Sequence, residues 1–230
     1  MKLSTGIEGL DKMLKGGLVP YKLYLIKGGP GTGKTTLSTH FTIEGVRNGE
    51  KVMYITLGES KEEIKEEMSL FGFEFDENNV VFIDASPTGD STIFGDIYFV
   101  DLVPDIQGFR SVLEQKIEEN KPTRVVIDPI TMLELASKSE IEYRRDLLSL
   151  MQILRKYKVT TIMTTEKRDD SPEEYIVSGI IELLTFDVDG KTIRGIRIKK
   201  MRGSDFDDTI RPYKITSKGI EVYAEAKMFE

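Results

Sequence analysis

Short apolar runs alternate with longer amphipathic stretches along the first three quarters of the chain. The apolar runs are rich in Val, Ile and Leu and are nearly unbroken, which is typical of strands covered on both faces. They predict five strands, at residues 22–27, 52–57, 80–84, 124–128 and 160–165. The amphipathic stretches between them predict four helices, at residues 35–48, 61–71, 108–120 and 141–157. This alternation indicates an α/β fold with a mostly parallel central sheet flanked by crossover helices.

The pattern changes after Ser178, where apolar runs follow one another without helical stretches between them. Four further strands are predicted, joined by turns such as those at 189–190 and 218–219, at residues 180–188, 192–200, 213–216 and 220–223. We expect them to form an antiparallel C-terminal extension of the same sheet. A stretch rich in Pro, Gly and Asp at residues 86–108 predicts a long irregular loop, and such loops are often functional. No linker interrupts the chain, so a single domain over residues 1–230 is expected.

The composition narrows the class of protein. The chain has 230 residues, which suits one large α/β domain with a sizeable core. Hydrophobic residues make up 39% of the chain and charged residues 31%. This composition is typical of a globular protein and differs from that of a disordered or membrane-spanning one. No run approaches the roughly 18 apolar residues of a membrane helix, and the first nine residues lack a signal pattern. A cytoplasmic protein without a membrane partner is therefore expected.

The scarcity of two residue types and the net charge exclude several kinds of chemistry. The chain has no cysteine, which excludes disulfides, thiolate metal sites and cysteine nucleophiles. Its single histidine, His40, excludes multi-histidine zinc sites and is expected to be a packed or capping side chain. The net charge of −7 disfavours sequence-independent binding of DNA, because attraction to phosphates needs clustered cations.

The strongest motif is GGPGTGKT at residues 28–35, a full match to the pattern G-x4-G-K-[ST]. Its glycines let the backbone wrap a phosphate, and the helix predicted to begin near Lys34 adds partial positive charge there. Lys34 is expected to reach the β- and γ-phosphates of ATP, and the Thr35 hydroxyl to bind Mg²⁺. The residues expected to contact the nucleotide are Gly29, Pro30, Gly31, Thr32, Gly33, Lys34, Thr35 and Thr36.

A second metal ligand is predicted at Asp128, which ends the apolar strand at residues 124–128. Mg²⁺ usually keeps several waters, so one carboxylate at a strand end, acting mainly through water, suits it. Many buried strands end in Asp, and the metal role depends on the pairing with the phosphate loop upstream. Pro129 follows Asp128, where many phosphate-loop families carry a catalytic Glu. A hydrolytic base must therefore come from another strand, or there is none.

With these motifs in view, the whole chain resembles the KaiC family, the single-domain archaeal relatives of the circadian-clock ATPase, within the RecA superfamily. Besides the phosphate loop, the resemblance rests on separated motifs in the same order: STGIEGLD at 4–11, GGL at 16–18, DASP at 84–87, ID at 127–128, TTE at 164–166 and KMRGS at 200–204. It implies a RecA-type fold. The chain resembles one such domain, whereas the clock protein has two.

The resemblance also implies a ring, usually a hexamer, with ATP between neighbouring subunits. In such proteins the segment that matches Lys200 and Arg202 reaches the nucleotide of the next subunit and neutralises γ-phosphate charge in trans. Ile215 and Ser217 match adenine-side contacts of the family. A plainer reading of the sequence stays open: Lys200 and Arg202 could belong to a solvated cationic strand edge with their neighbours Arg194, Arg197 and Lys199.

Two departures from the family pattern bear on chemistry. The family usually places two glutamates after the second strand, and the first is thought to polarise the attacking water; here the pair reads Gly58-Glu59. Glu59 could take the catalytic part, since a base must lie within hydrogen-bond reach of the water, or it could only cap the helix that starts near Ser60. Hydrolysis is accordingly expected to be slow. Self-kinase activity is not expected, because residues 175–178 lack the family's adjacent Ser/Thr pair.

Three functions remain open from the sequence. The first is a Mg-ATP-dependent ATPase that forms a homo-oligomeric ring with a regulatory role and an unidentified protein partner. The second is an ATP-gated binding module with negligible turnover, which the glycine at position 58 favours. The third is a RecA-like DNA-handling protein. It is disfavoured by the predicted loop at residues 166–174, whose net charge is about −3 where DNA would approach.

Overall fold

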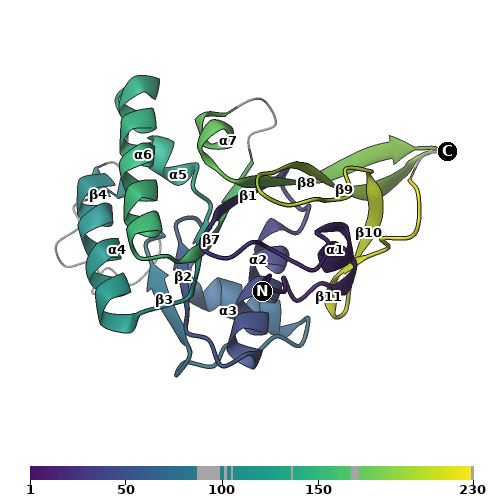
Figure 1. Cartoon of the computed structure of the whole chain (residues 1–230), viewed down its shortest axis with the longest axis horizontal. Helices are drawn as coiled ribbons and strands as arrows, with labels where there is room; N and C mark the ends of the chain where they lie inside the picture. Colours follow the sequence, from purple (N-terminus) through teal and green to yellow (C-terminus); the bar gives the residue numbers. More distant parts are fainter. Residues whose placement is uncertain (87–98, 101–102, 105, 136, 167–170, 229–230) are drawn as a thin grey trace.

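A computed structural model describes residues 1–86, 99–100, 103–104, 106–135, 137–166 and 171–228. Its centre is a nine-stranded sheet in the order β11-β10-β9-β8-β1-β7-β6-β2-β3 (Figure 1). The five strands of the first part are β1 (Leu23–Gly28), β2 (Val52–Thr56), β3 (Val80–Asp84), β6 (Arg124–Asp128) and β7 (Thr160–Thr165). All five pair in parallel, which confirms the predicted parallel sheet.

The C-terminal part adds four strands: β8 (Gly179–Val188), β9 (Lys191–Met201), β10 (Arg211–Thr216) and β11 (Gly219–Val222). The pairs β8–β9, β9–β10 and β10–β11 are antiparallel, as the sequence predicts. β8 itself lies parallel to β1 and so joins the two parts of the sheet. The carboxyl end of β1, where the phosphate loop begins, is thereby flanked by β7 on one side and β8 on the other.

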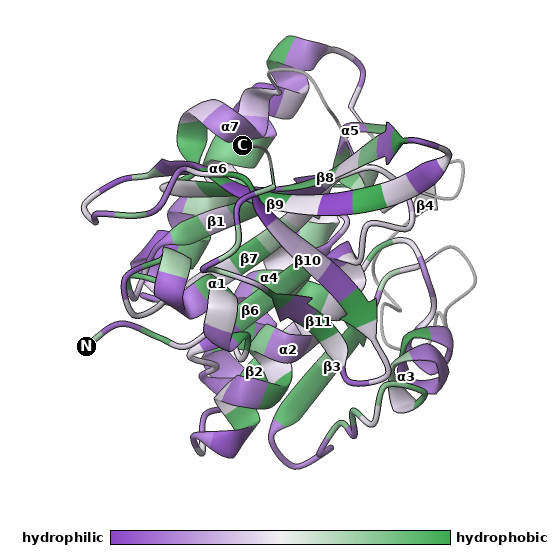
Figure 2. Cartoon of the chain, turned by 90° about the vertical axis from the view of Figure 1, so that its right-hand side faces the viewer, coloured by the Kyte–Doolittle hydropathy of each residue, from purple (hydrophilic) through white to green (hydrophobic). Residues whose placement is uncertain are grey.

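Helices cover both faces of the sheet. One core contains residues of α4 (Ile106–Asn120) and α6 (Glu140–Lys156), packed on side chains such as Leu25 and Ile127. The other contains residues of α1 (Glu8–Met13), α2 (Lys34–Arg47) and α3 (Lys61–Ser69), packed on side chains such as Tyr24 and Val126. Successive residues of each strand thus enter opposite cores. This explains the nearly unbroken apolar runs of strands such as β1 and β6, and Figure 2 shows hydrophobic residues along the central strands of the sheet.

The structure contains elements that the hydrophobic pattern does not predict. They are α1, the short helices α5 (Met132–Leu135) and α7 (Pro172–Ile176), and the two-stranded pair of β4 (Phe99–Val100) with β5 (Val103–Pro104). The β4–β5 pair and the first turn of α4 lie in the segment predicted as irregular, so that prediction is wrong for those residues. Residues 87–98 of the same segment lie outside the described residues. None of the helices in the described part of the chain is long and apolar enough to cross a membrane.

Candidate functional site

The segment between β1 and α2 forms a tight loop. Gly31 and Gly33 adopt φ angles of +70° and +90°, which favour glycine, and a Cβ on Gly33 would lie 3.1 Å from Ile215 Cδ1. Thr32 Oγ1 and Lys34 Nζ donate to the carbonyl of Gly29 at 2.8 and 3.1 Å. Because no side chain caps α2 at Gly33, the first N–H groups of this helix are left for an anion.

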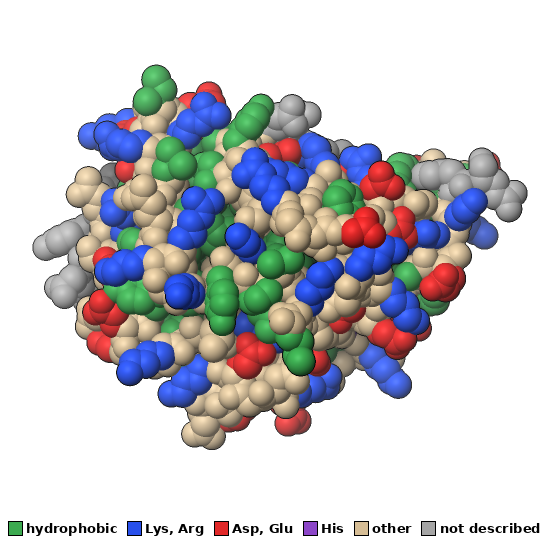
Figure 3. All heavy atoms as spheres, in the orientation of Figure 1, with side chains coloured by type: hydrophobic (Ala, Val, Ile, Leu, Met, Phe, Trp, Pro, Cys, Tyr) green, Lys and Arg blue, Asp and Glu red, His purple; other side chains and the backbone are tan. Residues whose placement is uncertain are grey.

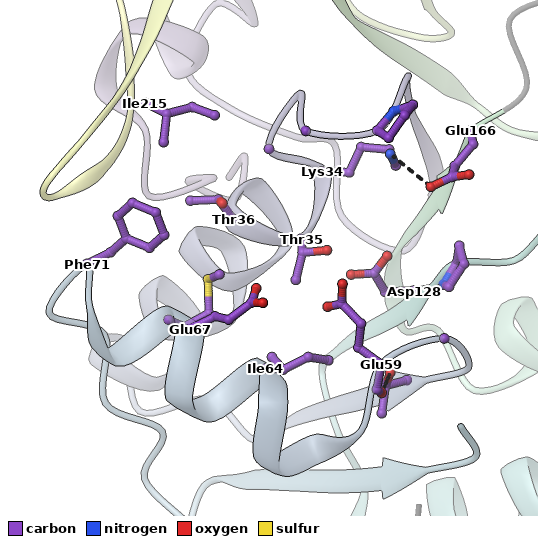
Figure 4. A pocket seen from close by; sticks show the side chains of 17 residues that line it. Lys34, Thr35, Thr36, Glu59, Ile64, Glu67, Phe71, Asp128, Glu166 and Ile215 are labelled. Atoms are coloured by element: carbon purple, nitrogen blue, oxygen red, sulfur yellow. Dashed lines mark hydrogen bonds and ion pairs between the residues drawn. The ribbon is translucent and has the colours of Figure 1, made fainter. Parts of the chain in front are cut away.

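The loop borders a pocket of about 400 Å³ at the carboxyl ends of the parallel strands. Figure 4 shows Lys34, Thr35, Glu59 and Asp128 around one end of this pocket, with Phe71 and Ile215 at the other. The residues lining it are Pro30, Gly31, Gly33, Lys34, Thr35, Thr36, Thr56, Gly58, Glu59, Ile64, Glu67, Met68, Phe71, Asp128, Pro129, Glu166 and Ile215. It therefore has a polar end beside the loop and an apolar end between α3 and β10.

Asp128 is held in place by two hydroxyl groups from neighbouring strands. Tyr54 Oη donates to Asp128 Oδ2 at 2.9 Å, and Thr164 Oγ1 donates to Oδ1. Burial raises the pKa of Tyr54 well above its usual value, and the adjacent Asp128 carboxylate raises it further. The phenol therefore stays protonated and continues to donate. The carboxylate is oriented by donors from β2 and β7, which is a more specific arrangement than a buried strand ending in Asp.

The predicted magnesium ligands lie together at the polar end of the pocket. In Figure 4 the Thr35 hydroxyl and the Asp128 carboxylate approach each other from α2 and β6. Both are oxygen donors, as the hard Mg²⁺ ion requires, and the open pocket leaves room for the waters that it retains. The residues present thus fit a magnesium ion. When bound there, the ion would neutralise charge on the β- and γ-phosphates.

Glu59 lies at the rim of the pocket, and the cap of α3 is a different residue. Ser60 Oγ accepts from the N–H of Glu63 at 3.3 Å, and the Glu63 carboxylate accepts from the N–H of Ser60 at 2.8 Å, which is a capping box. In Figure 4 the Glu59 carboxylate points into the pocket toward Asp128. Partial burial raises the pKa of Glu59, and the charges of Glu67, Asp128 and Glu63 raise it further.

Several lining residues were not predicted as site residues, and Glu166, Glu67 and Phe71 are among them. Glu166, just after β7, places Oε1 3.7 Å from Lys34 Nζ (Figure 4). Glu67 and Phe71 follow on α3 and in the turn after it. The position of Glu166 after a strand next to β1 was a usable signal, because parallel strands end at one edge of a sheet. Nothing in the sequence pattern places Phe71 opposite Ile215.

The predicted adenine-side residues differ in their placement. Ile215 in β10 lines the apolar end of the pocket, where Phe71 and Thr36 also lie. Ser217 is exposed in the turn after β10 and does not line it. β10 is nevertheless fixed to the loop, since Tyr213 Oη donates to the carbonyl of Thr32 at 2.7 Å.

Lys200 and Arg202 lie at the end of β9 and do not line the pocket of their own chain. Lys200 Nζ donates to the carbonyl of Glu174 at 2.6 Å, and Arg202 Nη2 makes a long contact of 3.5 Å with the carbonyl of Tyr175. Burial lowers the pKa of Lys200, and the nearby charge of Arg202 lowers it further. The predicted cationic edge is only partly solvated, because Arg197 pairs with Glu182 and Lys199 pairs with Glu174.

The segment at residues 166–174, predicted as an acidic loop, has a different structure where it is described. Residues 167–170 lie outside the described residues, and α7 begins at Pro172. Glu173 is fully buried and accepts a hydrogen bond from Tyr143 Oη, while Glu174 is buried against Lys27 and Lys199. Neither carboxylate faces solvent, so neither can repel DNA in the way that the sequence reading assumed.

His40 occupies the packed position that the sequence suggests. Its Nε2 accepts from the N–H of Ile220 at 2.9 Å, and its ring packs edge-on against Phe73 with centroids 4.7 Å apart. Burial lowers the pKa of His40 to about 4. The neutral ring therefore joins α2 to the β10–β11 hairpin.

Comparison with known proteins shows the family to which the chain belongs. The sequence model of the KaiC ATPase family matches residues 3–227. A UPF0273 protein of Thermotoga maritima is 33% identical over 96% of both chains, and one of Pyrococcus horikoshii is 32% identical over 97% of this chain and 94% of its own. The circadian clock protein KaiC3 of Synechocystis is 30% identical over 94% of this chain, which spans 44% of that longer protein. The chain, with its phosphate loop and RecA-type sheet, belongs to the KaiC family of ATPases.

Proposed function

We propose that this chain binds Mg-ATP in the pocket beside the phosphate loop and hydrolyses it slowly within a homo-oligomeric ring, for which the family suggests a hexamer. The observation that carries the proposal is the convergence of Lys34, Thr35 and Asp128 on one pocket of about 400 Å³. A nucleotide needs a phosphate cradle, a metal site and an apolar wall in one place. All three are supplied by this chain.

The triphosphate lies over the start of α2, where backbone N–H groups and the helix dipole favour negative charge. Lys34 Nζ leaves Glu166, 3.7 Å away, to contact the β- and γ-phosphates. Thr35 and Asp128 would hold the magnesium ion. The adenine ring lies toward Phe71 and Ile215 at the apolar end. Pro30, Gly31, Gly33 and Thr36 complete the contacts, while Gly29 and Thr32 hold the loop in shape.

The slow rate follows from the residues after β2. Gly58 has no side chain to activate the attacking water, and Glu59 is the carboxylate nearest to that role. Its raised pKa makes it a better proton acceptor when it is ionised. It stands one residue after the position that the water-activating carboxylate usually takes, and we expect this to make it a slower base.

Lys200 and Arg202 act on the nucleotide of the neighbouring subunit. Two cations at the end of β9 lie away from their own pocket and are held by carbonyl groups, which leaves their charge available. Charge of that kind stabilises a γ-phosphate during transfer. Through these residues the ring would sense nucleotide at each interface. A regulatory role, with a protein partner that recognises the assembled ring, fits this arrangement.

A second candidate function is an ATP-gated binding module that does not turn ATP over. Gly58 favours this function, because it has no side chain at the position where the water-activating carboxylate usually lies. The first measurement is the steady-state rate of ATP hydrolysis, with Lys34→Ala as the blank. A rate above the blank supports the ATPase. A rate equal to the blank, with ATP still bound by the wild type, supports the binding module.

A further inference from the structure

A buried cluster of charged residues lies directly behind the phosphate loop. Lys27, the β1 residue before Gly28, is only 3% exposed, and the side chains of Glu174 and Glu182 beside it are 7% and 8% exposed. Lys27 Nζ pairs with Glu174 and lies 3.9 Å from Glu182. Charges are buried at a cost of several kcal/mol each unless they are paired, so this cluster is fixed in one arrangement.

The same two carboxylates also bind the strand that carries Lys200 and Arg202. Lys199 Nζ lies 2.8 Å from Glu174 Oε2, and Arg197 pairs with Glu182. Glu174 thus joins three elements: α7, to which it belongs, β1 at the base of the phosphate loop, and β9. Figure 3 shows Lys and Arg side chains gathered over the part of the surface where α7 and the start of β8 lie in Figure 1.

An irregularity in β9 brings two consecutive lysines to Glu174. Neighbouring residues of a regular strand point to opposite faces. In the β8–β9 pair, however, Ile180 lies opposite Lys200 and Ile181 lies opposite Ile198, so Lys199 is an extra residue in β9. Such a bulge re-aims side chains. Lys199 Nζ reaches the carboxylate of Glu174, and Lys200 Nζ reaches its backbone carbonyl at 2.6 Å.

The side-chain carboxylate of Glu174 binds Lys199, whereas its backbone carbonyl binds Lys200, and the two contacts differ in charge. The carboxylate pairs with Lys199 and Lys27, and Glu182, which also lies near both lysines, pairs with Arg197. The carbonyl is neutral, so it orients Lys200 without cancelling its charge. An ammonium group has three donors, and one bond to a carbonyl leaves two for another acceptor. The Tyr175 carbonyl lies 3.5 Å from Arg202 Nη2, which is a weaker contact of the same kind. Three cations, Lys27, Arg197 and Lys199, share the two carboxylates. Lys200 and Arg202, the residues proposed to act on the neighbouring nucleotide, have only carbonyl partners for their side chains among the described residues.

We infer that Glu174 is a positioning residue for catalysis in trans. Its carboxylate fixes α7 between β1 and β9, and its carbonyl then holds Lys200, with Arg202 nearby, toward the next subunit. This inference rests on the proposed trans role of Lys200 and Arg202. Since Lys27 adjoins the phosphate loop, the competing possibility is that Glu174 serves only the pocket of its own chain.

The first test is Glu174→Gln, which keeps the shape of the side chain and removes its charge. We expect ATP affinity to stay within about two-fold of the wild type, because the pocket residues are untouched. Turnover should fall about 10-fold or more, since a misplacement on the order of 1 Å can cost 10²-fold. Glu173→Gln is the matched control: it lies on the same helix, is equally buried, and its amide oxygen can still accept from Tyr143. It should leave turnover unchanged.

The decisive test mixes two variants in one oligomer. Lys34→Ala subunits lack the phosphate lysine but keep Lys200 and Arg202, whereas Glu174→Gln subunits keep an intact pocket. If Glu174 acts in trans, an interface between a Glu174→Gln pocket and a Lys34→Ala neighbour is complete. Random mixing in equal amounts then restores about a quarter of the wild-type activity, because a ring has head-to-tail interfaces. ATP hydrolysis and ATP-dependent assembly are both measured, so that either can report recovery.

A parallel mixture of Lys34→Ala with Arg202→Ala separates the two ideas. Recovery in both mixtures supports the inference. Recovery with Arg202→Ala but not with Glu174→Gln overturns it, because Glu174 would then serve its own pocket or only the fold. Recovery in neither overturns the trans arrangement and this inference with it. Should Glu174→Gln fail to fold, as its thermal melting would reveal, Lys199→Gln replaces it, since this change keeps the Lys27–Glu174 pair and should give the same recovery.

Discussion

Lys34 and Lys200 are both held by a backbone carbonyl in the same protein, yet their surroundings differ. Lys34 Nζ is 3.1 Å from the carbonyl of Gly29, five residues away, inside the pocket that it serves. Lys200 Nζ is 2.6 Å from the carbonyl of Glu174, 26 residues away, and outside its own pocket. The first faces the pocket of its own chain. The second makes sense as a contribution to a site that needs a neighbour.

The difference shows two ways in which one fold positions a lysine side chain. The phosphate loop is built from eight consecutive residues whose glycines and helix N-terminus set its shape locally. The end of β9 is set by a bulge, by α7 and by buried ion pairs that bring distant segments together. Changes in the loop should therefore abolish binding within one chain. Changes at the end of β9 should act only where subunits meet.

The largest effect is expected from Lys34→Ala. Loss of a charged hydrogen bond costs about 1.5–3 kcal/mol, and here the lysine contacts two phosphates, so ATP affinity should fall by about 100-fold or more. Equilibrium dialysis or fluorescence with a labelled nucleotide measures it. Lys51→Ala, an exposed lysine just before β2, is the control and should bind normally. Unchanged ATP affinity in Lys34→Ala would show that ATP does not bind in this pocket.

Arg202→Ala should spare the site within one chain and impair the site between chains. We expect ATP affinity of the isolated subunit to be unaltered, because Arg202 does not line its pocket. Turnover should fall by about 10- to 100-fold, less than the 10³-fold or more of fast phosphoryl-transfer enzymes with an arginine finger, because the basal rate is slow. ATP-dependent assembly should weaken as well. Lys191→Ala, an exposed cation at the other end of β9, is the control. If Arg202→Ala changes neither turnover nor assembly, the cation is only a surface group.

Local patterns were sufficient to predict most of the fold and the phosphate half of the site. The predicted ranges of β3, β6 and β7 match their observed bounds, because β-branched and aliphatic residues make up most of each strand. The loop at residues 28–35 and the positions of Thr35 and Asp128 could be predicted, because each of these residues lies at the end of a strand or the start of a helix that the sequence pattern indicates.

What the sequence could not supply depends on distant contacts. The short helix α7 has only five residues, too few for a periodic pattern, and is held by the burial of Glu173 and Glu174. From the sequence alone, charged residues are expected to face solvent, so these two carboxylates were predicted to lie on the surface of an acidic loop. Their partners, Tyr143 and Lys27, are 30 and 147 residues away. Only a folded chain brings these groups together.

Gly58→Glu tests whether the pocket of one chain lacks only its base. The new carboxylate would stand one residue before Glu59, and we expect turnover to rise about 10-fold, the lower end of general-base effects being about 10²-fold. A full gain is not expected, because a Cβ at this position would lie 3.1 Å from Pro129 Cδ and the proline must shift slightly. Gly58→Ala introduces the same contact without the carboxylate and serves as the control. A rise in both variants, or in neither, would contradict the idea of a missing base.

The smallest and most specific effect concerns the pH dependence of turnover through Glu59. A general base must be ionised, so turnover is lost as pH falls through its pKa. Because that pKa is raised by partial burial and by Glu67, Asp128 and Glu63, this loss should begin at a higher pH than for an ordinary glutamate. Glu67→Gln removes the largest of the charge effects and should move the acid limb of the rate profile to lower pH. Glu59→Gln should lower turnover and abolish that limb. An acid limb that survives Glu59→Gln and does not respond to Glu67→Gln belongs to another group, and Glu166, which lines the same pocket, would be the next residue to replace.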